Sequence, residues 1–174
     1  MRSRLHYLSI ALIFFFAYSY IYLAYFYFQH KDLPTSTIVE STLPRSTEKI
    51  IRVIDGDTFE IEGGIKVRMI GIDTPEMKNK NKNIDCFATE AKKKAEQLLT
   101  GKEVILEKDI SETDKYGRLL RYVYIDGEMI NSILVKEGYA KISTFPPDVK
   151  HVEVFKAGEE SARESKLGLW SVCK

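Results

Sequence analysis

Residues 50–76 read IIRVIDGDTFEIEGGIKVRMIGIDTPE, and this stretch decides the fold class. Its first half holds two short runs rich in β-branched and aromatic residues, Ile50–Ile54 and Phe59–Glu62, which are typical of strands. Gly63-Gly64 then supplies a hairpin turn. In Ile65–Ile72 apolar and charged side chains alternate, as they do in a strand with one buried face. The stretch therefore predicts three consecutive strands joined by tight turns.

The remaining elements follow at short intervals. Small and apolar residues at helical spacing predict a helix over residues 88–99, which Gly101 ends. Two further strands (102–109 and 118–125) and two further helices (129–137 and 149–166) are predicted after it. Five short strands with a helix inserted after the third predict a five-stranded β-barrel of the OB type, an α+β fold with three helices.

Four acidic residues and an arginine stand out within this first stretch. Side chains at i and i+2 of an extended segment point the same way, so Asp55 and Asp57 are expected to face one site. Asp73 and Glu76 follow the third strand, which carries Arg68. Taken alone, D-G-D-T is more typical of a turn. The second acidic pair and the arginine instead favour a site for a hard divalent cation, above all calcium, because such ions prefer oxygen ligands.

The amino terminus differs from the rest of the chain. Residues 5–28 contain no Asp, Glu, Lys or Arg, and the run is long enough to cross a bilayer as a helix of about 20 residues. Arg2 and Arg4 precede it, so the positive-inside rule places the amino terminus in the cytoplasm and the domain outside. A signal peptide that is removed on secretion is the alternative, although no convincing small-x-small cleavage site follows the run.

The chain is accordingly divided into three parts. Residues 1–29 are the predicted membrane anchor or signal peptide, residues 30–47, rich in Thr, Ser and Pro, are a predicted flexible linker, and residues 48–174 are the domain. The formal net charge of the whole chain is only +1. This excludes a broad basic surface, so a nucleic-acid partner would be held by local arginines and a metal ion.

The chain has two cysteines, Cys86 and Cys173. Outside the cytoplasm a disulfide between them is permitted, and it would tie the carboxyl terminus to the start of the first long helix. Two unrelated buried thiols are the alternative. A structural zinc site is not expected, because no His or further Cys lies at ligand spacing.

Several separate motifs in one order resemble the staphylococcal nuclease (thermonuclease) family over about residues 49–171. They are V-I-D-G-D-T (53–58), V-R-M-I-G-I-D-T-P-E (67–76), T-E-A (89–91), T-D-K-Y-G-R (113–118), G-x-M-x-N-x-x-L-V-x-x-G-x-A (127–140) and G-L-W-S (168–171). The resemblance implies an OB barrel with three helices and calcium-dependent cleavage of DNA and RNA phosphodiester bonds, endo- and exonucleolytic. We also expect a monomer.

The resemblance also implies a metal site. Asp57 and Asp73 resemble the direct carboxylate ligands of calcium, and the backbone carbonyl of Thr74 resembles a further ligand. Asp55 would lie just outside them, through water. Glu76 resembles the residue that activates or positions the attacking water.

The other implied roles concern the nucleic acid. Arg68 and Arg118 resemble the family's two phosphate-binding arginines, and Lys115 and Tyr116 match residues beside the phosphate of the bound nucleotide. One departure is residues 143–146, which read STFP where the family often has tyrosines that stack on the base. A nuclease-like module without catalysis and a plain OB single-strand binder are the competing functions. Retention of both arginines and Glu76 argues against the former, and the near-neutral charge against the latter.

Overall fold

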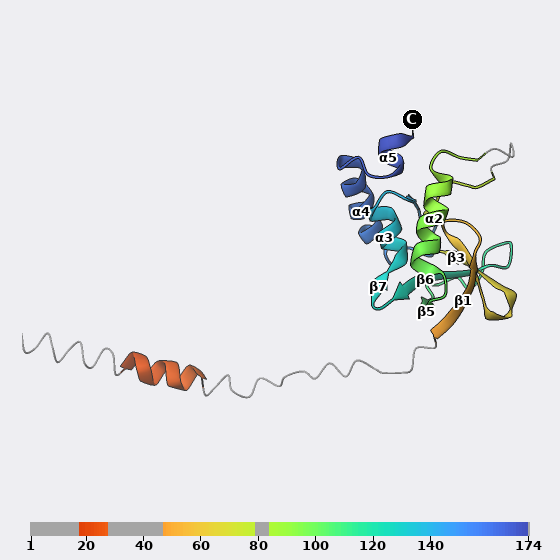
Figure 1. Cartoon of the computed structure of the whole chain (residues 1–174). Helices are drawn as coiled ribbons and strands as arrows, with labels where there is room; N and C mark the ends of the chain where they lie inside the picture. Colours follow the sequence, from red (N-terminus) through yellow and green to blue (C-terminus); the bar gives the residue numbers. More distant parts are fainter. Residues whose placement is uncertain (1–17, 28–46, 79–83, 174) are drawn as a thin grey trace, which may run out of the picture. The chain divides into compact units, whose positions relative to one another are not determined.

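The structure is a computed structural model that describes residues 18–27, 47–78 and 84–173. The chain forms two units, Met1–Leu43 and Pro44–Lys174. In the first unit the described residues 18–27 form a helix (Figure 1). Its side chains are largely exposed. Within the described ranges, no helix has both the length and the apolar character that crossing a bilayer requires. Most of the predicted anchor and linker lies outside these ranges, so both stay predictions.

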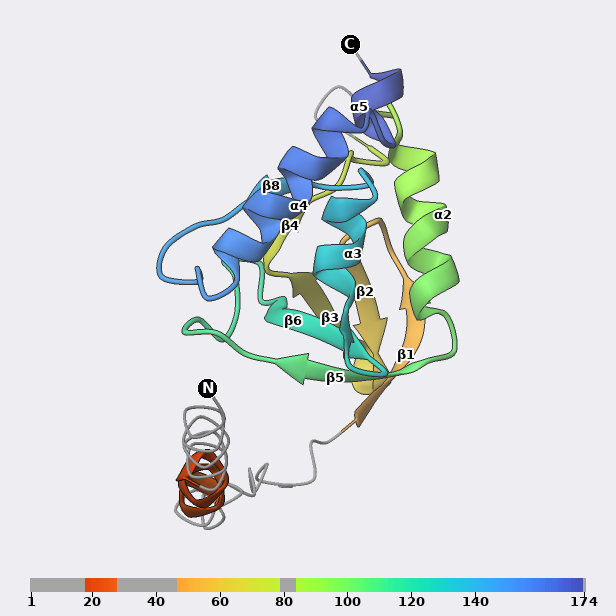
Figure 2. The same ribbon diagram turned by 90° about the vertical axis from the view of Figure 1, so that its left-hand side faces the viewer.

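Five strands of the second unit close into a barrel (Figure 2). They are β1 (Thr47–Val53), β2 (Thr58–Ile61), β3 (Ile65–Met69), β5 (Glu103–Glu107) and β6 (Leu119–Ile125). The order is β3-β2-β1-β5-β6 with antiparallel neighbours, and a parallel pairing of β3 with β6 closes the ring. A two-residue strand, β7 (Glu128–Met129), extends the sheet beside β6. The predicted five-stranded OB-type barrel is confirmed.

The alternation of side chains along β3 fills the barrel and positions one site residue. Val67 and Met69 point inward and are at most 1 % exposed. Arg68, between them, points to the opposite face, because successive side chains of a strand alternate. Phe59 and Val123 are fully buried in the same core. Packing of the inward residues thus sets the direction in which the guanidinium of Arg68 leaves the barrel.

The predicted single strand over residues 65–72 is divided in the structure. β3 ends at Met69, and β4 (Gly71–Asp73) pairs instead with β8 (Lys141–Ser143) in a separate two-stranded sheet. Gly71 has φ +80°, and a Cβ there would lie 2.4 Å from the ring of Phe155. A residue with a side chain would therefore be strained and would clash. The break turns the chain out of the barrel just before Asp73.

A buried asparagine fixes this break. Asn131 is fully buried; its Oδ1 accepts a hydrogen bond from the amide of Val123 at 2.9 Å, and its Nδ2 donates one to the carbonyl of Ile70 at 2.9 Å. Ile70 is the residue between β3 and β4. Because a buried polar group left without partners is costly, the pair of bonds holds the break in one position relative to β6.

Helices pack over one side of the barrel, and α3 lies between α2 and α4 in both views (Figures 1 and 2). They are α2 (Ala88–Leu99), α3 (Ile130–Lys136), α4 (Val152–Glu164) and a short α5 (Leu169–Val172). The predicted helix over 149–166 starts later, at Val152, and the amide of Lys150 in the preceding turn donates to Oδ2 of Asp109 at 3.0 Å. The short α5 adds a fourth helix to the three that we predicted.

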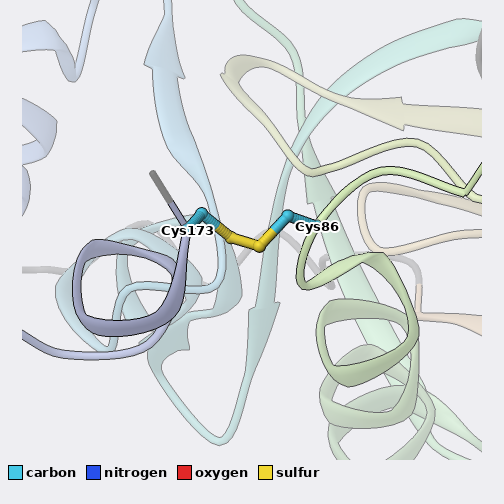
Figure 3. The surroundings of a disulfide bond; sticks show 2 residues. All are labelled: Cys86 and Cys173. Carbon is cyan, nitrogen blue, oxygen red and sulfur yellow. A yellow bond between two sulfur atoms is a disulfide. The ribbon is translucent and has the colours of Figure 1, made fainter.

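Cys86 and Cys173 form a disulfide, with Cα atoms 5.8 Å apart (Figure 3). Cys86 lies two residues before α2, and Cys173 directly follows α5. The bond closes a loop with a sequence separation of 87 residues. Closing a loop of this length stabilises a folded chain by about 4.6 kcal/mol in the chain-entropy model. The carboxyl-terminal helix is thereby attached beside the amino-terminal end of α2.

Candidate active site

The turn between β1 and β2 carries the first two acidic residues. The prediction that Asp55 and Asp57 share a face of an extended segment is wrong, because residues 55–57 form a bend. The amide of Asp57 donates to Oδ1 of Asp55 at 3.2 Å, which is a local Asx-type contact. Gly56, at the centre, would place a Cβ 2.7 Å from the side chain of Thr74. The turn therefore brings the carboxylates of Asp55 and Asp57 close together. It also packs against Thr74, in the segment after β4.

The carboxylate of Asp57 is buried and fully engaged. Its Oδ1 accepts a hydrogen bond from the hydroxyl of Thr58 at 3.0 Å. Its Oδ2 accepts from both the amide and the hydroxyl of Thr74, at 2.9 and 3.1 Å. Asp57 is only 4 % exposed and Thr74 only 3 %. These bonds fix the β1–β2 turn against the residue that follows Asp73.

Arg68 joins the two predicted calcium ligands. Its guanidinium forms an ion pair with Oδ2 of Asp57 and, through Nη2, a 2.7 Å bond with Oδ1 of Asp73. The arginine side chain is 15 % exposed, and that of Asp73 is 51 % exposed. The structure thus brings Asp57, Asp73, Thr74 and Arg68 into direct contact, although they come from the β1–β2 turn, β3 and the end of β4.

Three of the acidic groups have raised pKa values. Burial raises the pKa of Asp55 to about 6, and the nearby charge of Asp57 adds to this. Burial also raises the pKa of Asp73, with repulsion from Asp57 opposed by the attraction of Arg68. Partial desolvation, followed by the charges of Asp57 and Asp73, raises the pKa of Glu76. Carboxylates that raise each other's pKa in this way form a site of concentrated negative charge.

Arg118 is held by a residue to which we assigned no role. Its Nε and Nη2 both bond to Oδ2 of Asp114, at 2.7 and 2.6 Å, and its own amide donates to Oδ1 at 3.0 Å. Nη1 of Arg118 lies 3.4 Å from the hydroxyl of Thr58. Asp114 therefore orients the arginine, and Thr58 links it to Asp57. Residues 114–118 have the spacing Asp-x-x-Gly-Arg, which is typical of a tight turn whose first Asp accepts nearby amides. This spacing could have predicted that Asp114 contacts Arg118.

An open pocket of about 620 Å³ lies in front of the two arginines. Arg68, Asp73 and Arg118 line it together with Lys115 and Tyr116. Tyr116 is 72 % exposed, and Lys115 Nζ and the Arg118 guanidinium lie 5.0 and 5.6 Å from the centre of its ring. The predicted phosphate-binding residues therefore share one wall of one pocket. Phe145, which is 73 % exposed, lines the same pocket.

Glu76 lies on the other side of Asp73. It is exposed and lines a second, smaller pocket of about 300 Å³, to which Asp73 also contributes. Its amide donates to Oδ2 of Asp85 at 3.2 Å, and its carbonyl accepts from the amide of Asp85 at 3.0 Å. Sequence reasoning missed Asp85, because a partner nine residues away in an irregular segment leaves no periodic signal.

The donor set agrees in kind with a calcium site. Asp55, Asp57, Asp73 and Glu76 offer only oxygen atoms, which hard cations prefer. Within residues 18–27, 47–78 and 84–173, no group of three or more His, Cys, Asp or Glu side chains is arranged to hold a metal ion. Calcium takes six to eight oxygen ligands, which carboxylates, backbone carbonyls and water together can supply.

A closed five-stranded barrel of this strand order is an OB fold, and Arg68, Asp73 and Arg118 line a pocket on it. A model of the family described as Staphylococcal nuclease homologue matches residues 66–172. The chain belongs to this family.

Individual relatives support the same family. A thermonuclease of Staphylococcus hyicus is 39 % identical over 134 residues, which are 75 % of this chain and 79 % of the relative. A thermonuclease of Staphylococcus intermedius is 38 % identical over 122 residues, 68 % of this chain and 73 % of that protein. Endonuclease YncB of Bacillus subtilis is 39 % identical over 125 residues, 69 % of this chain but only 59 % of YncB.

Proposed function

We propose that this protein is a calcium-dependent nuclease that cleaves DNA and RNA outside the cytoplasm. Its class, a nuclease that hydrolyses phosphodiester bonds, follows from the family and from the thermonuclease and endonuclease relatives. The observation that carries the proposal is the arrangement around Asp73. Arg68 and Arg118 line the pocket on one side of this residue, and Glu76 lines the pocket on the other.

The residues that would hold calcium are Asp57, Asp73 and the backbone carbonyl of Thr74, with Asp55 acting through water. Bound there, the ion supplies positive charge that polarises a phosphate oxygen and lowers the pKa of water. The protein's part is to keep the two carboxylates at a fixed separation. The bonds from Thr74 and Thr58 to Asp57 support this role, because they leave the buried carboxylate little freedom to rotate.

Arg68 and Arg118 bind the scissile phosphate. A planar guanidinium offers five N–H donors and can meet two oxygens at once, which a lysine cannot do. Negative charge concentrates on the phosphate oxygens as water adds, so donors already in position stabilise the transition state more than the ground state. The contacts of Arg118 with Asp114 and Thr58 support this role, because an arginine held on both sides loses little entropy on binding.

Glu76 acts on the attacking water. It either takes the water's proton on a carboxylate oxygen or orients the water by a hydrogen bond. Partial desolvation raises the pKa of Glu76, which is the direction that a general base requires. Its place in the second pocket, to which Asp73 also contributes, supports a role beside the proposed metal site.

Three exposed residues contact the rest of the nucleotide. Lys115 and Tyr116 lie beside the phosphate, and Phe145 offers a ring on which a base can stack in place of the family's tyrosines. Stacking accepts any base, so this contact gives little sequence preference. The near-neutral charge of the chain agrees with binding by a few placed cations and not by a basic surface.

We further propose that residues 5–28 anchor the protein in the membrane with the nuclease domain outside, or are removed as a signal peptide. The disulfide supports an oxidising location, because such bonds persist outside the reducing cytoplasm. Fractionation separates the two cases. An anchored protein stays with the membranes, whereas a processed one appears in the medium without its first residues.

Cleavage by the full-length protein tests the function. Plasmid DNA and a defined RNA are incubated with millimolar calcium, with and without a chelator. Cleavage is expected only with calcium. Glu76→Gln and Arg118→Ala should each lower kcat by about 10²-fold or more, because each removes a group that acts in the transition state.

Glu90→Gln is the matched control, because Glu90 is an exposed carboxylate in the first turn of α2. It should keep the wild-type rate. Intact substrate after prolonged incubation of the folded wild-type protein with calcium would exclude the proposed activity and would favour a nucleic-acid-binding scaffold.

A further inference from the structure

The backbone of Glu76 is bonded to a residue outside the catalytic set. Its amide and carbonyl form two hydrogen bonds with Asp85, one to the Asp85 carboxylate and one from the Asp85 amide. In the described residues 74–78, which contain Glu76, no helix or strand forms. The position of Glu76 therefore depends on contacts with other segments and not on regular secondary structure, and Asp85 supplies a reciprocal pair of them.

Asp85 is in turn next to the disulfide. Cys86 follows it directly, and Cys173 lies at the end of α5 (Figure 3). α5 is fixed to the core through Leu169, which is 2 % exposed and whose amide donates to the carbonyl of Gly138 at 2.9 Å. A continuous path of bonds thus runs from the core through α5 and the disulfide to Asp85 and Glu76.

The same residues surround one hollow. Glu76, Asp85, Cys86, Leu169 and Cys173 all line the pocket of about 300 Å³ beside Asp73. The disulfide is therefore part of the wall that faces the water-activating residue, and it is not a remote clamp. Cys86 is exposed, so a small reductant in solution can reach the bond.

We propose that Asp85 is a positioning residue for Glu76, and that the Cys86–Cys173 disulfide holds Asp85 in place, so that reducing the disulfide lowers the rate of phosphodiester cleavage. The inference rests on the proposed function in assigning a catalytic role to Glu76. Its physical content is that loss of the disulfide frees the segment around residue 85, and that a displacement of Glu76 by about 1 Å is enough to lower the rate about 10²-fold.

The chemistry of the switch is thiol–disulfide exchange. A dithiol gives up two electrons and two protons and becomes a cyclic disulfide, while the bond between Cys86 and Cys173 breaks and each sulfur becomes a thiol. The protein is then fully active only where disulfides are stable. Newly made chains in a reducing compartment would cleave nucleic acid slowly, and oxidation after export would bring the enzyme to full rate.

Steady-state kinetics of the full-length protein test the inference. The oxidised wild type is compared with the same protein treated with dithiothreitol, and with Cys86→Ser/Cys173→Ser, all at saturating calcium and below the onset of thermal unfolding. We expect kcat to fall about 10- to 100-fold in both cases, with KM within about twofold, because Arg68 and Arg118 are not displaced. The double serine variant should not respond to dithiothreitol.

Substitution of Asp85 separates positioning from stability. Asp85→Ala should lower kcat as much as reduction does, and reduction of Asp85→Ala should add little, because both changes break the same connection. Asp85→Asn keeps an oxygen that can accept the Glu76 amide and should restore most of the rate. Glu90→Ala, which removes another carboxylate near the start of α2, should leave kcat unchanged.

Hydrogen exchange gives a readout that does not need catalysis. Reduction or Asp85→Ala should speed exchange of the Glu76 amide at least tenfold, while amides of β2 and β3 keep their protection. Unchanged kcat and unchanged Glu76 exchange in the reduced, folded protein would overturn the inference. If the oxidised wild type cleaves nothing, the proposed function fails, and the exchange rates still decide whether the disulfide orders Glu76.

Discussion

The carboxylate of Asp57 accepts two hydrogen bonds from Thr74, one from its amide at 2.9 Å and one from its hydroxyl at 3.1 Å. The two residues are seventeen positions apart, and both are buried. The bonds tie the turn before β2 to the chain directly after Asp73. Asp57 and Asp73 are the proposed side-chain ligands of calcium, and these bonds, together with the ion pairs of Arg68 with both carboxylates, hold the two residues near each other.

We first predict that Thr74→Val weakens calcium binding. The substitution keeps the shape of the side chain and the amide bond but removes the hydroxyl donor, so Oδ2 of Asp57 loses one of its partners. Loss of a residue that orients a ligand typically costs about 10- to 100-fold in metal affinity. Calcium titration of the cleavage rate should show this shift with little change in the rate at saturation, and calorimetry should show the same change in Kd.

Thr74→Ser is the control, because it keeps a hydroxyl, and it should bind calcium as the wild type does. Equal calcium affinity in the valine variant would show that the hydroxyl does not orient Asp57.

We next predict that Asp114 acts through Arg118. Asp114→Ala removes the acceptor of Nε, Nη2 and two backbone amides, so the guanidinium loses its fixed direction. We expect kcat/KM to fall about 10- to 100-fold. In an Arg118→Ala background the same change should cost little, because the two residues form one unit. Additive losses in the double variant would mean that Asp114 serves the fold of the turn and not the arginine.

The strands of the barrel could be predicted because their pattern is local. Alternation along residues 65–69 marks one face for the core, and on this face Val67 and Met69 are buried in the structure, whereas Ile65 at the start of the strand is exposed. The break after Met69 was missed because its cause is distant: Gly71 is pressed against the ring of Phe155 on another element. The sequence around Gly71 does not predict that contact.

The site could be predicted only in part, for the same reason. Asp57, Asp73, Arg68 and Arg118 belong to short motifs whose order points to one family. In the structure Asp73, Arg68 and Arg118 line one pocket, and Asp57 forms an ion pair with Arg68. Asp85 has no such motif, because its role depends on where an irregular segment returns to Glu76. Residues that orient a site from other segments become visible only when the hydrogen bonds are known.

The acid sensitivity of the fold should depend on Asp148. This buried carboxylate accepts the amides of Ile110 and Ser111 at 3.0 and 2.7 Å. Burial opposes ionisation, but these hydrogen bonds outweigh it and lower the pKa of Asp148 below its usual value. A lowered pKa in the folded state means that the stabilisation is complete above the unfolded-state pKa of about 3.9 and is lost as the pH falls through the folded-state value.

Comparison with Asp148→Asn isolates this contribution. Asparagine keeps the shape and one oxygen acceptor but cannot ionise. The wild type should be more stable than the variant at neutral pH, and the difference should shrink as the pH falls below about 5. Urea unfolding at a series of pH values measures it, and the other carboxylates cancel because both proteins contain them. A difference that stays constant with pH would show that the charge of Asp148 contributes nothing.

The contact between α5 and the core gives the last prediction. Gly138 has φ +76°, and a Cβ at this position would lie 2.4 Å from the carbonyl oxygen of Leu167. The carbonyl of Gly138 also accepts a hydrogen bond from the amide of Leu169. The two segments of the chain, around residues 138 and 168, therefore cannot move apart without breaking this bond. Gly138→Ala should cost about 1–2 kcal/mol for the left-handed backbone and a further ~1–3 kcal/mol for the clash.

Gly127 is the matched control, because its φ of +85° is similar and nothing lies within 4 Å of the position of its missing Cβ. Gly127→Ala should therefore show only the backbone cost of about 1–2 kcal/mol. Denaturant unfolding under oxidising conditions measures both variants. Because Gly138 anchors the helix that carries Cys173, its alanine variant should also speed exchange of the Glu76 amide, whereas Gly127→Ala should not. Equal destabilisation of the two variants, with equal exchange at Glu76, would contradict this prediction. It would show that α5 adapts to the added methyl group and that its contact with Gly138 does not keep Glu76 in place.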